Sequence, residues 1–212
     1  MPSSNNNISF RSATPSDVAQ AVPLIYSSGP DVCEFMFYDA KKGSAQNFFA
    51  YGFTRSGGEL GYDNHTCILI DNKVVGIGAI WNGKKTFSFM LADIKKIFAF
   101  FGFFKGLMIL FRALKVEMLI PPPKKKEWVI AHLAIDSTIT GKGLGTKLIH
   151  YLIDSVSIKP DEKTILDVSF INPKAQKLYE RLGFKVTKKK ESKLQRKKYN
   201  VKVPGHYRME RE

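Results

Sequence analysis

A glycine-rich turn is the place where this chain is best suited to bind an anion. Residues 141–145 read Gly-Lys-Gly-Leu-Gly, after a strand-like apolar run and before a helical pattern. A strand that leads through glycines into a helix leaves several backbone N–H groups unpaired at the positive end of the helix dipole. Glycine lacks the Cβ that would keep a phosphate away, and it accepts left-handed backbone angles. The turn therefore predicts a phosphate site, to which Lys142 adds a positive charge.

Other chemistries fit the sequence less well. A Walker loop needs G-x-x-x-x-G-K-[ST] and a dinucleotide fingerprint needs G-x-G-x-x-G, whereas the spacing here is G-x-G-x-G. Glycines between a strand and a helix also occur only for tight packing, and the turn alone does not exclude that reading. The sequence has no G-x-S-x-G elbow, which argues against a serine hydrolase. Three histidines are too scattered along the chain to predict a metal site: His65, His150 and His206.

The stretches around the turn predict the elements that hold it. Residues 128–135 form a strand-like run before the turn, and residues 143–155 have a helical pattern after it. A second strand at residues 165–169 and a second helix at residues 173–182 repeat this order. Strand–helix–strand order implies a locally parallel strand pair. The turn is therefore expected at the end of one strand of such a pair.

The remaining segments predict antiparallel strands around this unit. A strand at residues 8–11 is followed by a helix start at Thr14-Pro15-Ser16-Asp17 and by a kinked, discontinuous helical region. Two apolar runs then flank Asp71-Asn72-Lys73, a composition typical of a hairpin turn. The runs at residues 184–187 and 207–211 predict a terminal hairpin. The expected result is a mixed α/β sheet.

An apolar insertion at about residues 83–126 interrupts this pattern. Its residues 97–111 are rich in phenylalanine, but a lysine and two glycines interrupt the run, and a bilayer span needs roughly 20 apolar residues. We expect the insertion to pack on the domain or on a second copy in a homodimer. Membrane contact is a minor alternative.

Composition and charge limit the number of domains, the kinds of partner and the cellular compartment that we expect. The 212 residues suit one domain, and 33 Lys and Arg against 19 Asp and Glu give a formal charge of +14. Basic charge can follow a nucleic-acid backbone, attract an acidic ligand or only solvate a surface. Cys33 and Cys67 form no C-x-x-C pair and no signal peptide precedes them, so we expect a reduced, cytoplasmic protein.

Two segments resemble motifs of the GNAT (Gcn5-related N-acetyltransferase) superfamily. Motif A, in which [RQ]-x-x-G-x-[GA] cradles the pyrophosphate of coenzyme A, resembles HLAID at residues 132–136 together with TGKGLGTKL at residues 140–148. Motif B, N-x-x-A-x-x-L-Y-x-x-x-G-F, resembles NPKAQKLYERLGF at residues 172–184. The resemblance covers roughly residues 128–185. It implies a mostly antiparallel sheet with flanking helices and a splayed central parallel strand pair.

The resemblance also implies where acetyl-CoA, the acyl donor, would bind. The pantetheine arm would pair with the backbone between the splayed strands, and the N–H groups of the turn would hold the pyrophosphate. The residues implied in coenzyme binding are Leu133, Ala134, Ile135, Thr140, Gly141, Lys142, Gly143, Leu144, Gly145, Thr146, Asn172 and Ala175. Thr140 departs from the motif, which usually has Arg or Gln there. A lost charged contact to phosphate is worth about 1.5–3 kcal/mol, so coenzyme binding is expected to be weaker unless another basic residue compensates.

The resemblance implies direct transfer of an acetyl group, with Tyr179 as the donor to the departing thiolate. The base is open. Val129 takes the position where some members have a glutamate, which leaves Glu127, His132 or water. A lysine acceptor is neutral only about once in 2,500 at pH 7, so it needs more help than an α-amine does.

We therefore expect an acetyl-CoA-dependent N-acetyltransferase that acts on a primary amine of a small molecule, peptide or protein. No metal is expected, and we expect neither nucleic acid nor a membrane as a partner. Two alternatives stay open: a noncatalytic acyl-CoA-binding module, and a basic nucleic-acid-binding protein.

Overall fold

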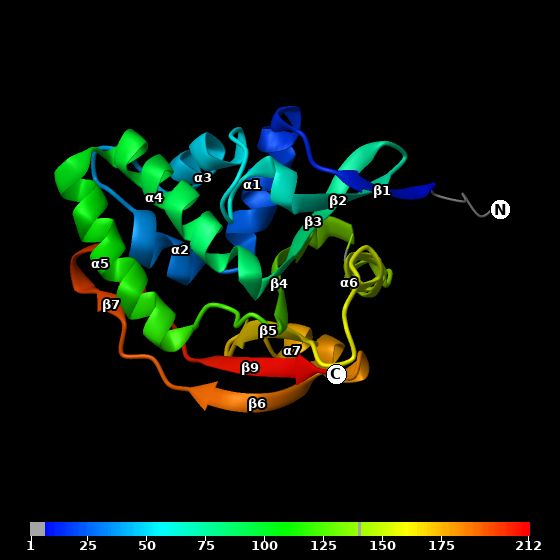
Figure 1. Cartoon of the computed structure of the whole chain (residues 1–212). Helices are drawn as coiled ribbons and strands as arrows, with labels where there is room; N and C mark the ends of the chain where they lie inside the picture. The colour runs from blue at the N-terminus through cyan, green and yellow to red at the C-terminus, as the bar shows by residue number, and fades with distance from the viewer. Residues whose placement is uncertain (1–6, 140) are drawn as a thin grey trace.

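The computed structural model describes residues 7–139 and 141–212 as a seven-stranded sheet with helices on both faces (Figure 1). All neighbouring strands run antiparallel except β4 and β5, which are parallel. The strand order is β1 (Ile8–Ser12), β2 (His65–Ile70), β3 (Lys73–Asn82), β4 (Glu127–Ile135), β5 (Lys163–Ser169), β9 (His206–Arg211) and β6 (Lys185–Lys190). A separate pair joins β7 (Gln195–Arg196) to β8 (Val201–Lys202). This is the expected mixed, mostly antiparallel sheet.

The helices divide between the two faces of the sheet. One face carries α1 (Val18–Ser27), α2 (Pro30–Phe37), α3 (Ala45–Phe53), α4 (Thr86–Phe101) and α5 (Phe103–Leu119). The other face carries α6 (Leu144–Asp154) and α7 (Pro173–Arg181). Short 3-10 turns complete the described chain: η1 (Pro15–Asp17), η2 (Tyr62–Asn64), η3 (Gly83–Lys85), η4 (Ser137–Ile139) and η5 (Lys197–Tyr199).

The alternation of side chains along each strand builds a core on each face. Neighbouring residues of a strand point to opposite sides, so Cys67 of β2 joins the cluster with α1 and α3 while Ile68 joins the cluster with α6 and α7. Fully buried side chains of α1, α3 and α6 pack against the sheet, among them Phe48 of α3 and Leu148 of α6, and α7 adds the buried ring of Tyr179. The sheet is therefore the middle layer of three.

The local signals read from the N-terminal half are confirmed. Thr14 and Asp17 form a capping box at η1, and Asp17 also accepts two hydrogen bonds of 2.7 Å from the Arg11 guanidinium. The hairpin turn between β2 and β3 has left-handed backbone angles at Asp71 (φ 50°) and Asn72 (φ 64°). These residue types tolerate such angles better than most, which explains their place at the turn.

The apolar insertion forms the two-helix hairpin of α4 and α5. Gly106 lets the helices approach, because a Cβ there would lie 2.6 Å from the ring of Phe98. The inner faces pack on the domain, where the buried ammonium of Lys96 donates to the carbonyls of Gly52 and Arg55 at 3.2 Å each. Among residues 7–139 and 141–212, no helix combines the length and the apolar character that a membrane crossing needs.

Candidate functional site

The parallel strands β4 and β5 separate along their length. Their register pairs Glu127, Trp128 and Val129 with Lys163, Thr164 and Ile165, and no pairing of β4 with β5 continues beyond Val129 in the described structure. The far part of β4 stays bonded to β3 on its other edge, through Ala134 opposite Ile77 and Ile135 opposite Gly76. The edge of β4 at Leu133, Ala134 and Ile135 therefore faces an opening in the sheet, as expected for a splayed pair.

The glycine turn lies at the far end of β4 and begins α6. Gly141 (φ 84°) and Gly143 (φ 72°) have left-handed backbone angles, and a Cβ at either position would have nothing within 4 Å. Gly143 is the N-cap of α6, so the following N–H groups are the ones that lack helical partners. Lys142 is exposed beside them. The surface above the turn is open and edged by backbone donors, which suits an anion.

The remaining turn residues differ in what they present. Leu144 is buried in the core, so only its backbone can serve a ligand, while Thr146 is half-buried. A Cβ on Gly145 would lie 3.3 Å from Leu178, so this glycine allows α6 to pack closely on α7. Thr140 lies outside the described residues.

Tyr179 projects from α7 into the apolar cluster beneath the sheet. Its side chain is 8% exposed and its ring lies edge-on to Phe184 with centroids 6.2 Å apart. Its hydroxyl has no hydrogen-bond partner among the residues that the structure describes. Burial raises the pKa of Tyr179 to about 12. The phenol therefore stays protonated and can only donate or accept a hydrogen bond near neutral pH.

Asn172 and Ala175 form the first turn of α7. The Asn172 Oδ1 accepts a hydrogen bond from the Ala175 N–H at 3.1 Å, which caps the helix, and Pro173 follows as the first helical residue. The Asn172 side-chain NH₂ is not used by the cap. Asn172 is exposed and Ala175 half-buried, so both can be reached from solvent.

His132 stands at an irregularity of β4 and is bonded to His65. The register between β3 and β4 shifts near Gly78, and His132 has the unusual φ of 55° that directs it across β3 toward β2. Its Nδ1 lies 2.9 Å from the His65 Nε2, while the His65 Nδ1 lies 2.8 Å from the carbonyl of Gly61. Burial lowers the pKa of His65 to about 4 and that of His132 to about 3, so both rings are neutral at pH 7.

This chain of bonds assigns the protons. A carbonyl can only accept, so the His65 Nδ1 carries a hydrogen and its Nε2 is an acceptor. His132 must then donate from Nδ1, which leaves its Nε2 with a lone pair. His132 is half-buried, next to Leu133 at the opening of the sheet, whereas His65 is fully buried. His65 was not singled out from the sequence, where 67 residues separate the pair.

Glu127 is engaged in structural bonds. Its Oε2 accepts a hydrogen bond from the Lys124 N–H at 2.8 Å, and its Oε1 lies 3.7 Å from the Lys163 ammonium. The residue is 5% exposed and stands at the closed end of the β4–β5 pair. These contacts fit a charge that ties strand ends together. Val129, two residues further along β4, is packed in an apolar cluster.

A family model described as Acetyltransferase (GNAT) family matches residues 34–184. This is more than half of the chain. The protein is a member of the GNAT acetyltransferase family. The match spans the opening between β4 and β5, the glycine turn and α7.

Solved structures share the GNAT fold over nearly the whole chain. An N-acetyltransferase from Staphylococcus aureus Mu50 superposes with a TM-score of 0.65 at 16% identity, covering 96% of this chain and 100% of its own. Arabidopsis thaliana NAA60, in complex with a bisubstrate analogue, superposes with a TM-score of 0.55 at 15% identity, covering 96% of this chain and 98% of its own. Arabidopsis thaliana Naa50, in complex with CoA-Ac-MVNAL, superposes with a TM-score of 0.54 at 15% identity, covering 97% of this chain and 98% of its own. No curated protein matches the sequence.

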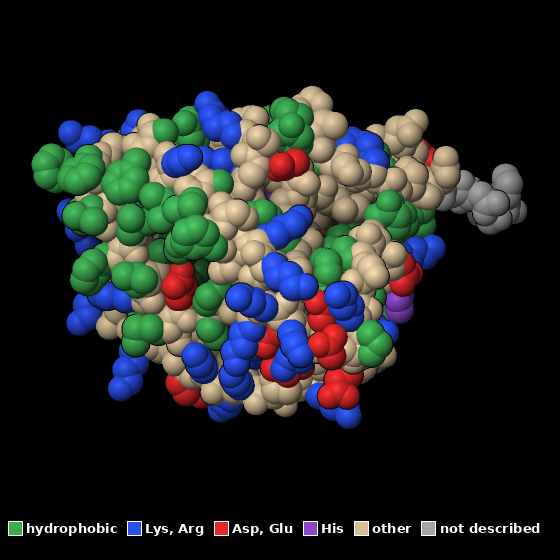
Figure 2. Space-filling model, in the orientation of Figure 1, with side chains coloured by type: hydrophobic (Ala, Val, Ile, Leu, Met, Phe, Trp, Pro, Cys, Tyr) green, Lys and Arg blue, Asp and Glu red, His purple; other side chains and the backbone are tan. Residues whose placement is uncertain are grey.

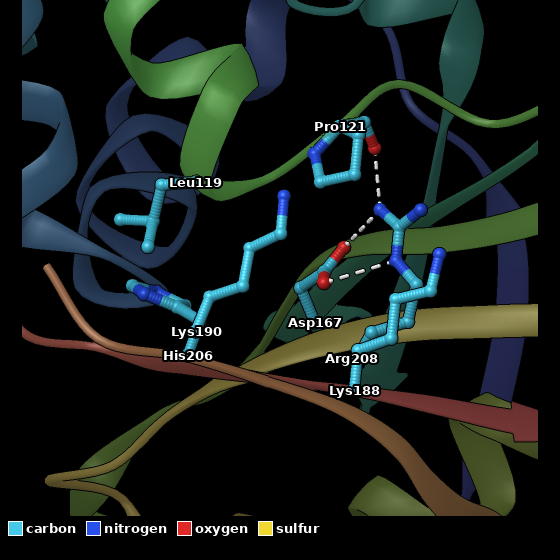
Figure 3. Close-up of a pocket in the computed structure, with 7 residues that line it drawn as sticks. All are labelled: Leu119, Pro121, Asp167, Lys188, Lys190, His206 and Arg208. Carbon is cyan, nitrogen blue, oxygen red and sulfur yellow. Dashed lines mark hydrogen bonds and ion pairs between the residues drawn. The ribbon is translucent and has the colours of Figure 1, made fainter.

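A small pocket lies where the end of α5 meets β5, β6 and β9 (Figure 3). Arg208 donates to both oxygens of Asp167, at 3.1 and 2.7 Å, and to the carbonyl of Pro121. The carboxylate that faces the pocket is therefore already paired with a guanidinium. The pocket volume of about 10 Å³ holds one water molecule at most. The cluster attaches the insertion to the sheet and leaves no room for a coenzyme.

A larger hollow opens between α2 and the β7–β8 hairpin, which sequence reasoning did not identify. It has about 570 Å³ and is lined by Glu34, Tyr38, Ser44, Lys197, Lys198, Tyr199, Asn200 and Val201. Arg196 supports it by donating to the carbonyls of Glu34 and Tyr38, at 3.1 and 2.9 Å. Its two sides are about 160 residues apart in sequence, so no local motif could reveal it. Within the described ranges, no group of three or more His, Cys, Asp or Glu is arranged to hold a metal ion.

Proposed function

We propose that this protein is an acetyl-CoA-dependent N-acetyltransferase that transfers the acetyl group directly to a primary amine of a small molecule, peptide or protein. The observation that carries the proposal is the opening between β4 and β5, which leads at its far end to the open glycine turn of α6. Two proteins of the same fold were captured with bisubstrate analogues, one of them CoA-Ac-MVNAL. Such ligands join both substrates of a direct transfer.

The fit of the coenzyme rests on this chain's own backbone. The free edge of β4 at Leu133, Ala134 and Ile135 would pair with the amide groups of pantetheine, as an added strand does. The N–H groups of residues 141–146 would hold the pyrophosphate, with Lys142 as a mobile counter-charge. The Asn172 side-chain NH₂ and the small Ala175 would border the arm at the start of α7.

The bond changes need a donor near sulfur and an acceptor near the amine. The amine nitrogen forms a bond to the acetyl carbon while the carbon–sulfur bond breaks, so nitrogen loses one proton and sulfur gains one. A backbone N–H near Leu133 would polarise the carbonyl. The Tyr179 hydroxyl, which has no partner among the described residues, would donate a hydrogen bond to the departing thiolate. Its raised pKa of about 12 favours donation of a hydrogen bond over complete proton transfer, so the thiolate would take its proton from solvent.

His132 is the residue we assign to the amine. Its Nε2 lone pair, left free by the bond from Nδ1 to His65, would accept a hydrogen bond from the attacking amine or from a water beside it. Burial lowers its pKa to about 3, so His132 would orient the amine without holding the proton, which passes to solvent. We do not assign Glu127 to the attacking amine, because its carboxylate is already bonded to the Lys124 N–H and paired with Lys163.

A site without a strong base selects its acceptor by basicity. An α-amine with a pKa near 8 costs about 1.4 kcal/mol to neutralise at pH 7, and a lysine near 10.4 costs about 4.6 kcal/mol. We therefore expect amines of low pKa as preferred acceptors. Both cysteines, Cys33 and Cys67, are free, and we infer a reducing, cytoplasmic setting from them.

The test begins with thermal unfolding in the presence and absence of acetyl-CoA. A ligand at 100 times its dissociation constant stabilises by about 2.7 kcal/mol, which for this chain length corresponds to roughly 5–10 °C. Thiol release with a panel of α-amine and lysine acceptors then measures transfer. A thermal shift without thiol release for any acceptor would point to a noncatalytic binder, and no shift at millimolar coenzyme would refute the proposal.

A further inference from the structure

The insertion carries an exposed apolar surface that folding does not explain. Figure 2 shows hydrophobic side chains gathered over α4 and α5, with Lys and Arg mostly at the margins. We call this surface the outer helical face. Its members are between 43% and 82% exposed: Phe87, Met90, Leu91, Phe103, Phe104, Leu107, Met108, Phe111, Leu114 and Met118. Contiguous apolar surface of this kind marks an interaction site in soluble proteins.

The spacing along α5 shows that the surface is a built feature. Its inner side presents Gly106, Ile109, Val116 and Leu119 to the core. The outer side repeats apolar residues every three or four positions, from Phe104 to Met118. A helix that is apolar on both sides is normally buried on both sides. The outer side of α5 therefore lacks the partner that its composition requires.

The two helices join into one continuous surface. Phe98 of α4 and Phe103 of α5 stack with ring centroids 5.7 Å apart, and Gly106 accommodates the Phe98 ring. The hairpin lies on the side of the molecule away from α6 and the glycine turn (Figure 1). A large flat partner could thus cover the outer helical face without covering the coenzyme opening.

The charges around the outer helical face indicate what covers it. Exposed lysines stand on or beside the helices, and Lys190 donates to the carbonyl of Met118 at the end of α5. The exposed lysines are Lys85, Lys95, Lys115, Lys124, Lys125 and Lys126, of which Lys126 pairs with Asp161 at 2.8 Å, and Lys190 is half-buried. The acids of α4 and α5 are Asp93 and Glu117, and Asp93 is occupied by the Glu59 N–H at 2.9 Å. The rim is therefore basic.

A basic rim favours a lipid surface over a second copy of the chain. A two-fold dimer would bring the same lysines of both copies together, in a protein with a formal charge of +14. An anionic bilayer accepts aromatic and aliphatic side chains at its acyl boundary and attracts lysines at its headgroups. Neither helix is long and apolar enough to cross a membrane, which fits helices that lie in its plane.

We propose that the outer helical face binds the surface of anionic phospholipid membranes, with α4 and α5 parallel to the bilayer plane. The apolar side chains enter the headgroup and acyl boundary, and the rim lysines contact phosphate and carboxylate groups. This proposal does not depend on the acyltransferase activity. It differs from the packing expected from the sequence, where the membrane was only a minor alternative.

Vesicle co-sedimentation of the full chain tests the proposal. Vesicles of phosphatidylcholine with about one third phosphatidylserine should bind the protein, and pure phosphatidylcholine should bind it more weakly by about 10-fold or more. The triple variant Phe104→Gln, Phe111→Gln and Met118→Gln should bind anionic vesicles at least about 100-fold more weakly. These side chains are 66–82% exposed, so the variant should keep the thermal unfolding temperature of the wild type.

The matched control changes exposed apolar residues elsewhere. The variant Ile171→Gln with Val186→Gln removes side chains that are 70% and 42% exposed but lie outside the outer helical face, and it should bind vesicles as the wild type does. Equal vesicle binding by the triple variant and the wild type would overturn the proposal. So would a lack of vesicle binding together with a dimer, seen by sedimentation equilibrium, that the triple variant converts to a monomer.

Discussion

At the scale of single residues, the site depends on groups whose hydrogen-bonding capacity the fold leaves unused. The Tyr179 hydroxyl and the His132 Nε2 have no partners among the described residues, although both side chains are largely enclosed. Neither atom is among the buried polar atoms that lack a partner in the described structure, so both can be reached from solvent and by a ligand. Both atoms are therefore available to bond with the substrates that we propose.

Removing the Tyr179 hydroxyl tests its part in transfer. Tyr179→Phe keeps the buried ring and should keep stability, because the hydroxyl has no partner to lose. A hydrogen bond to a charged group is worth about 1.5–3 kcal/mol, so kcat should fall about 10- to 150-fold with little change in the KM for acetyl-CoA. Steady-state thiol release measures both constants. Tyr151→Phe on the outside of α6 is the matched control, and equal kcat values for all three proteins would remove Tyr179 from the mechanism.

Asn172 can be tested for two separate roles. Asn172→Ala removes the cap to Ala175 and should lower the free energy of unfolding by about 1 kcal/mol. Asn172→Ser keeps an oxygen that can cap the helix but loses the side-chain NH₂, so its stability should stay within a few tenths of a kcal/mol of wild type. If the NH₂ contacts pantetheine, both variants should raise the KM for acetyl-CoA. A wild-type KM for Asn172→Ser would show that the residue is only a cap.

Sequence motifs identified the residues that act within one short segment. The turn at Gly141 and Gly143 and the helix start at Asn172 follow from local backbone geometry, which a motif records. The bond between His65 and His132 could not be predicted, because it needs β2 and β4 to lie on either side of β3 and needs the irregularity near Gly78. The engagement of Glu127 by Lys163 likewise depends on the parallel strand pair.

At the scale of elements, the strands and helices from β4 to α7 were predictable because their patterns are simple. Their observed bounds lie within two residues of the expected ones at each end. The helical nature of the insertion was not recognised, since α5 is apolar on both sides and shows no polar face. A helical pattern is read from contrast between faces, and the outer helical face removes that contrast.

The glycine turn offers a prediction about the junction between β4 and α6. Gly143→Ala should cost about 1–2 kcal/mol of stability, because its φ of 72° strains any residue with a Cβ. The new Cβ also points into the open space above the turn, so loss of a charged phosphate contact should weaken acetyl-CoA binding by about 10- to 150-fold. Isothermal titration measures the dissociation constant directly.

The matched control for this junction is Gly183→Ala. Gly183 has a φ of 87° in the turn between α7 and β6, and a Cβ there would have only Arg211 near it, at 4.0 Å. The same backbone strain should thus lower stability without changing coenzyme affinity. Equal losses of affinity in the two variants would mean that destabilisation, not the phosphate contact, is responsible.

At the scale of the whole molecule, the neutral histidine pair should make stability depend on pH. The pKa values of His65 and His132 are lowered by burial to about 4 and 3, so below pH 6.5 the unfolded chain binds more protons than the folded one. The contribution of these two neutral histidines to the free energy of unfolding is then fully present above pH 6.5, and it is lost as the pH falls below that value. Desolvated carboxyl groups such as Asp93 act in the opposite direction, because desolvation raises the pKa of Asp93 to about 6.

A single substitution separates the histidine contribution from these opposing carboxyl groups. Asn tolerates the φ of 55° at position 132, so His132→Asn should fold, and its free energy of unfolding should depend less on pH. Between about pH 6 and 5 the slope should fall by up to about 1.4 kcal/mol per pH unit relative to wild type, the contribution of one titrating group. Urea unfolding across this range measures the slopes. His150→Asn, at an exposed position on α6, should leave the slope unchanged. Because the carboxyl groups are the same in all three proteins, parallel slopes for wild type and His132→Asn would contradict a neutral His132, and with it the free Nε2 lone pair that we assign to the amine.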